Sequence, residues 1–153
     1  MRPIDSWLAE YGACHQNHTN KILHWICVPL IMLSLVVMLA AVPRPAAFAI
    51  SPWLHWGTVL IAAALVYYFV LAPRLALGVA MLGVALLLAT WGLARLPWTL
   101  ALTGGVIFVV AWIGQFIGHH FEGKRPAFFK DLQFLLIRPL WVVFAVHRRM
   151  GLR

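Results

Sequence analysis

The chain has 153 residues, of which 63% are apolar and 10% are charged, and its net charge is +8. Soluble domains average roughly 45–50% apolar and 25% charged residues, so this composition predicts a membrane protein, with residues 1–153 as a single membrane domain. Its two cysteines exclude a secreted disulfide framework, and both are expected to act as small apolar residues. The basic residues separate apolar runs instead of clustering with exposed aromatic residues, which argues against nucleic-acid binding.

Four apolar runs follow one another along the chain. A helix needs roughly 20 apolar residues to cross the hydrocarbon core, and in lipid it must pair its own backbone groups. Membrane-spanning helices are therefore predicted near residues 24–42, 54–72, 75–94 and 98–118. Proline and arginine mark the breaks, at Pro43-Arg44-Pro45, Pro73-Arg74 and Arg95-Leu96-Pro97.

Four spans place both termini on the same side of the membrane. Of the twelve basic residues, only Arg44 and Arg95 then lie on the opposite side. Because cytoplasmic loops carry an excess of Lys and Arg, both termini are predicted to be cytoplasmic.

The two ends of the chain, residues 3–20 and 126–149, are predicted to be interfacial segments. In the second, apolar residues from Phe128 to Leu136 recur at helical spacing, with Lys130 and Asp131 between them. That pattern is typical of an amphipathic helix lying in the membrane interface. The expected fold is thus an all-α integral membrane protein, with four transmembrane helices and amphipathic interfacial helices at both ends.

Histidines gather at the predicted cytoplasmic interface, where six of the seven lie. His119 and Glu122 are three residues apart, a spacing that helix-bundle metal sites use. His15 and His24 are nine apart, so both reach one site only if the helix breaks between them. Asn17 and its neighbours Thr19 and Asn20 are cap-forming residues that supply such a break.

Imidazole and carboxylate ligands without thiolate suit iron, zinc or manganese, and two histidines with one carboxylate form the facial arrangement of ferrous oxygenases. Gln115, one turn before His119, is a candidate partner that orients an imidazole. Lys124 and Arg125 are candidates to hold a substrate carboxylate, although positive-inside anchoring explains them equally well.

Two motifs in this chain resemble a known family. His15 to Pro29 fits H-x-N-x-x-N-x-x-x-H-x-x-x-V-P, and Gln115 to Ala127 fits Q-F-x-G-H-x-x-E-x-x-x-P-A. Together they resemble the small membrane family of the fungal endoplasmic-reticulum 2-hydroxy fatty acid dioxygenase, which has many bacterial relatives. The resemblance extends over the whole chain.

This resemblance implies a ferrous-iron-dependent α-oxidation, in which a 2-hydroxy fatty acid and dioxygen give a fatty acid one carbon shorter and carbon dioxide. It implies His15, His24 and His119 as iron ligands, with Glu122 and His120 as candidate catalytic residues. Asn17, Asn20 and Gln115 are expected to support the ligands. The expected location is the bacterial inner membrane or, in eukaryotes, the endoplasmic reticulum.

Other functions stay open on the residues alone. The main alternative is a non-catalytic four-span lipid-binding or scaffold protein. A haem protein with two axial histidines is another. A zinc hydrolase is disfavoured because no H-E-x-x-H motif occurs. The number of irons, the acyl length and whether the chain forms a homo-oligomer are also open.

Overall fold

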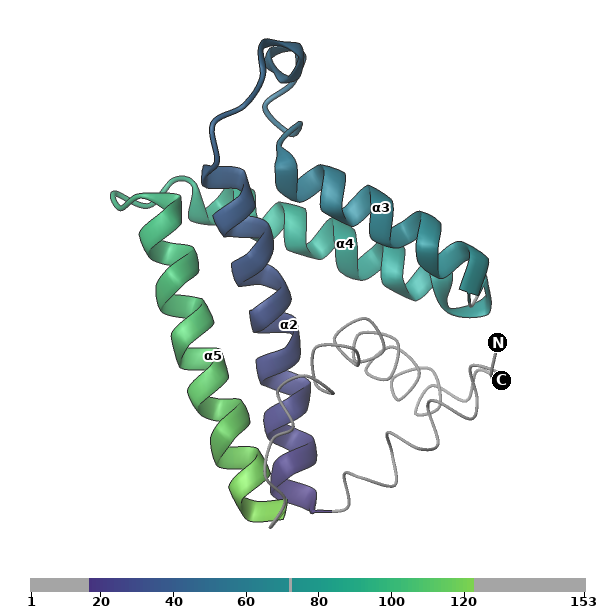
Figure 1. Ribbon diagram of the computed structural model, residues 1–153, viewed down its shortest axis with the longest axis vertical. Helices are drawn as coiled ribbons and strands as arrows, with labels where there is room; N and C mark the ends of the chain where they lie inside the picture. The colour runs from purple at the N-terminus through teal and green to yellow at the C-terminus, as the bar shows by residue number, and fades with distance from the viewer. Residues whose placement is uncertain (1–16, 72, 123–153) are drawn as a thin grey trace. The chain divides into compact units, whose positions relative to one another are not determined.

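The computed structural model describes residues 17–71 and 73–122. Its elements, in chain order, are α2 (His18–Ala41), the short 3₁₀-helix η1 (Ala46–Ile50), α3 (Trp56–Leu71), α4 (Pro73–Leu93) and α5 (Leu100–Glu122), as Figure 1 shows. The described residues contain no β-strand, so the all-α prediction is confirmed for them. The predicted interfacial segments 3–20 and 126–149 lie outside the described residues, apart from residues 17–20.

Three helices are long and apolar enough to cross a membrane: His18–Ala41, Ala76–Leu93 and Leu100–Phe121. Large apolar side chains are exposed on each of them, as at Ile26, Leu77 and Val109. Contiguous exposed apolar surface is unfavourable in water and favourable against lipid tails. The helices are therefore those of a membrane protein.

The remaining predicted span, near 54–72, is the 16-residue helix α3. At 1.5 Å per residue, it is about 24 Å long, which is short of the roughly 30 Å hydrocarbon core. Its start is set by His55, whose Nδ1 accepts a hydrogen bond from the Thr58 backbone N–H at 3.3 Å and so caps the helix. The next helix begins at Pro73, so Pro73 and Arg74, where the sequence predicts a break, lie in the first turn of α4. The four-span arrangement stays a prediction.

Helix α2 begins at His18 and not near residue 24, because Asn17 caps it. The Asn17 Oδ1 accepts hydrogen bonds from the backbone N–H groups of Thr19, at 2.9 Å, and Asn20, at 3.3 Å. The predicted break between His15 and His24 thus falls at Asn17, while Thr19 and Asn20 lie in the first helical turn.

The described residues form two compact units, which are considered separately. One comprises residues 30–111, the other residues 17–29 and 112–122. In the first unit, α3 and α4 run side by side (Figure 1). Glycines permit close packing there: a Cβ at Gly83 would lie 2.9 Å from Ile61 Cγ2, and one at Gly104 would lie 2.7 Å from Met38 Cγ.

Replacing Gly57 with alanine is expected to destabilise this unit by about 1–3 kcal/mol through overpacking. The added Cβ would lie 2.7 Å from the Val36 carbonyl oxygen, which is backbone and cannot rotate away, and 3.0 Å from His55 Nδ1. The measurement is the free energy of chemical unfolding in detergent, with circular dichroism as the readout. Gly92→Ala is the matched control, because no neighbour lies within 4 Å of its added Cβ. Equal stability of the two variants would contradict the packing at Gly57.

Candidate functional site

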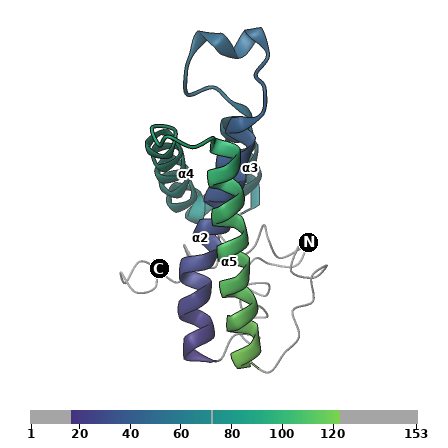
Figure 2. The same ribbon diagram turned by 90° about the vertical axis from the view of Figure 1, so that its left-hand side faces the viewer.

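In the unit of residues 17–29 and 112–122, the start of α2 packs against the end of α5 (Figure 2). Two glycines of α5 bring the helices together. A Cβ at Gly114 would lie 2.6 Å from Cys27 Sγ, and one at Gly118 would lie 2.6 Å from Asn20 Oδ1. Asn17 Nδ2 also donates a hydrogen bond to the Phe121 carbonyl oxygen at 3.3 Å. Side chains from two distant stretches of the sequence therefore meet between the helices.

His24 is fully buried in this helix pair. Its Nδ1 lies 3.0 Å from the Asn20 carbonyl oxygen, one turn earlier on α2. A carbonyl oxygen only accepts hydrogen bonds, so Nδ1 carries the proton and Nε2 of the neutral ring carries the lone pair. Histidines that bind metals characteristically donate the other ring N–H to a carboxylate or backbone carbonyl in this way.

His119 reaches the same place from α5. The centres of the His24 and His119 rings are 5.2 Å apart, and the ring planes make an angle of 80°. Two imidazoles that share a metal ion at about 2.1 Å from each nitrogen have ring centres roughly 5 Å apart. The pair therefore fits two ligands of one metal ion, and its donor atoms suit ferrous iron.

Gln115 lies one turn before His119 on α5, and only 1% of its surface is exposed. Neither Oε1 nor Nε2 of its carboxamide has a hydrogen-bond partner among the described residues. Burying an amide without partners costs about 1–3 kcal/mol for each polar group, so a bound polar molecule there would be stabilised. The sequence predicts Gln115 as a partner that orients an imidazole, but within the described residues no hydrogen bond joins its carboxamide to either histidine.

The helix pair brings together five of the predicted site residues: Asn17, Asn20, His24, Gln115 and His119. His120, the adjacent residue, is instead exposed, and its ring centre is 6.4 Å from that of Phe121. The other predicted residues, His15, Lys124 and Arg125, and the side chain of Glu122 lie outside the described part of the chain. Within residues 17–71 and 73–122, no group of three His, Cys, Asp or Glu residues is arranged to hold a metal ion.

Cys27 also lies in this helix pair, as the small buried residue that the sequence predicts. It is buried one turn after His24 on α2, and its Sγ faces Gly114 of α5. The spacing of Asn20, His24 and Cys27 places all three on one face of a helix.

The family model described as "2-hydroxy-palmitic acid dioxygenase Mpo1-like" matches residues 1–150. The chain is 32% identical over 152 residues to the 2-hydroxy-palmitic acid dioxygenase of Saccharomyces cerevisiae, covering 97% of this chain and 82% of the yeast protein. No solved structure matches the chain.

Proposed function

Because the chain belongs to the family of 2-hydroxy-palmitic acid dioxygenase Mpo1-like proteins, we propose that it is a ferrous-iron-dependent 2-hydroxy fatty acid dioxygenase. The observation that carries this proposal is the His24–His119 pair, in which His24 Nδ1 is bound to a backbone carbonyl. The reaction converts a 2-hydroxy fatty acid and dioxygen into a fatty acid one carbon shorter, carbon dioxide and water. The substrate supplies all four electrons that dioxygen accepts, so no separate reductant is needed.

His24 and His119 would hold the iron, with His15 as the further ligand that the family resemblance implies. Iron bound there would supply Lewis acidity toward a 2-hydroxy carboxylate and the redox chemistry that activates dioxygen. The Asn20 carbonyl keeps the proton on His24 Nδ1, which leaves Nε2 basic and fixes the ring plane.

In α5, polar residues would bind the carboxylate and hydroxyl group of the substrate, and apolar residues would contact its acyl chain. Gln115 has an N–H₂ donor and a carbonyl acceptor, which suits the carboxylate and the hydroxyl group of the substrate. Glu122 would accept the proton of that hydroxyl. The exposed side chains of Phe116 and Ile117 lie on the same helix, and we assign them to contact with the acyl chain in the bilayer. Lys124 and Arg125 are the further candidates for the carboxylate.

We also propose the membrane arrangement on which this function depends. The whole chain forms one membrane domain with four spans, of which α3 is the shortest. Both termini are cytoplasmic, because all basic residues except Arg44 and Arg95 then lie on that side. The iron site then lies near the cytoplasmic face.

The proposal is tested with full-length protein purified anaerobically in detergent and loaded with ferrous iron. We expect iron-dependent conversion of 2-hydroxypalmitic acid to pentadecanoic acid with release of carbon dioxide, measured by mass spectrometry. 3-Hydroxypalmitic acid should not react, because its hydroxyl and carboxylate are not placed to bind one metal ion as a five-membered chelate. Bound iron without turnover of any 2-hydroxy acid would contradict the proposed reaction. Failure to bind iron would favour the non-catalytic lipid-binding alternative.

A further inference from the structure

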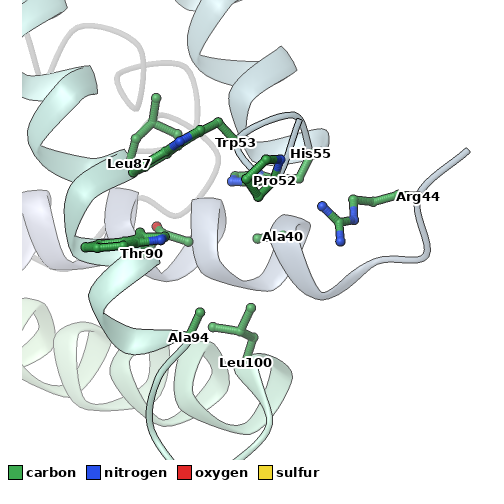
Figure 3. A pocket seen from close by; sticks show the side chains of 10 residues that line it. Ala40, Arg44, Pro52, Trp53, His55, Leu87, Thr90, Ala94 and Leu100 are labelled. Carbon is green, nitrogen blue, oxygen red and sulfur yellow. The ribbon is translucent and has the colours of Figure 1, made fainter. Parts of the chain in front are cut away.

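A second polar site lies within the unit of residues 30–111, where the loop before α3 meets the end of α4 (Figure 3). It is a cavity of about 150 Å³. Its polar lining consists of Arg44, His55 and Thr90, and the ring systems of Trp53 and Trp91 flank them. A cavity needs only roughly 10–15 Å³ to hold one water molecule, so this one has room for a small polar group.

His55 presents a hydrogen-bond donor in this cavity. The residue is only 7% exposed, and its Nδ1 accepts the hydrogen bond from Thr58 N–H that caps α3. The proton of the neutral ring is therefore on Nε2. Burial, and secondarily the positive charge of Arg44, lowers the pKa of His55, which favours the neutral ring.

Arg44 supplies positive charge that no acidic residue of this unit can balance. The sequence contains no Asp or Glu between Glu10 and Glu122. The other cation near the cavity, Arg95, lies over the Trp91 ring at 3.4 Å from its centre. In Figure 3 the Arg44 side chain extends from the loop toward the cavity. A guanidinium beside a buried N–H donor is a recurrent way to recognise an anionic oxygen group.

We propose that this cavity binds the phosphate of an anionic membrane lipid. A lipid is favoured over a soluble anion because the site has the features of the membrane interface. Trp53 and Trp91 stack with ring centres 5.6 Å apart at a helix end, and tryptophans concentrate at the level of lipid headgroups. Leu87 and Leu100 line the same cavity and suit the apolar start of the acyl chains. The site shares no residue with the proposed iron centre.

The test uses full-length protein in detergent, titrated with phosphatidylglycerol or phosphatidylcholine and followed by native mass spectrometry. We expect phosphatidylglycerol to bind at least about tenfold more tightly than phosphatidylcholine, the factor typical of a charged hydrogen bond. Arg44→Gln should remove this preference. Arg74→Gln is the matched control, because it removes the same charge at the opposite end of α3 and should keep the preference.

A second variant, His55→Ser, separates lipid binding from folding. Serine can still cap α3 by accepting from Thr58 N–H, but it lacks the Nε2–H donor. We expect weaker binding of phosphatidylglycerol with unchanged helix content. If Arg44→Gln does not fold, this variant tests whether the cavity binds phosphatidylglycerol. An equal loss in Arg44→Gln and Arg74→Gln would overturn the proposal in favour of diffuse charge attraction. Binding of glycerol phosphate as tight as that of the lipid would overturn the lipid assignment.

Discussion

Replacement of His24 by alanine is expected to lower the affinity for ferrous iron by more than about a hundredfold and to reduce turnover of 2-hydroxypalmitic acid to background. Loss of a residue that only supports a ligand typically costs 10–100-fold in metal affinity, so loss of a ligand should cost more. His24 is fully buried and shares its site with the His119 ring at 5.2 Å. The measurements are iron content per chain and product formation, on the same anaerobic preparation.

The control for this variant is His18→Ala. His18 lies on the same helix, six positions earlier, but its side chain is exposed. Both variants lose an imidazole from α2, but only His24→Ala removes one that is buried between α2 and α5. His119→Ala, made on the other helix, should match His24→Ala, and circular dichroism establishes that each variant keeps its helix content. Full iron binding by His24→Ala and His119→Ala would end the assignment of the metal centre.

The helices could be predicted largely from charge. Uncharged runs long enough to cross a bilayer are rare by chance, so they predict where the middle of each helix lies. The residues at which a helix begins and ends depend instead on single hydrogen bonds. Asn17 starts α2 at His18, and His55 starts α3 at Trp56. Neither cap is visible from hydropathy, because hydropathy averages over many residues and a cap is one side chain.

The five residues that the helix pair brings together could be predicted as a set, but their geometry could not. The spacing of His119 and Gln115 puts them on one face of α5, which is a local property of a helix. Their meeting with His24 depends on how closely α2 and α5 approach, and that is set by Gly114 and Gly118. Sequence periodicity shows that such residues are small but not which atoms they meet.

His55 is a residue whose role the sequence analysis did not predict. Sequence reasoning left it without a role, because it stands apart from the other histidines. Its position directly before an uncharged run, with Thr58 three residues later, was the available signal for a helix cap. The cavity it shares with Arg44 and Trp91 depends on a loop and a second helix, which no local pattern in the sequence connects.

Gly118→Ala is the substitution expected to damage the metal centre without removing any ligand. The added Cβ would lie 2.6 Å from Asn20 Oδ1 and 3.5 Å from Leu23 Cβ. Asn20 is fully buried, so its side chain has little room to rotate away from this Cβ, and a shift of the α2 backbone at Asn20 would move the carbonyl oxygen that holds His24 Nδ1. We expect overpacking to cost about 1–3 kcal/mol of stability, and iron affinity to fall roughly tenfold or more because the His24–His119 spacing changes.

Gly105→Ala, on the same helix, distinguishes packing from helix propensity. No neighbour lies within 4 Å of the Cβ added there, and alanine favours helix over glycine by about 0.5–1 kcal/mol, so this variant should be as stable as the parent or more so. Gly118→Ala gains the same propensity, and any loss therefore reports the contact with α2. A Gly118→Ala protein that binds iron as tightly as Gly105→Ala would mean that the helices do not approach closely at Asn20, and the ligand geometry inferred from that approach would be wrong.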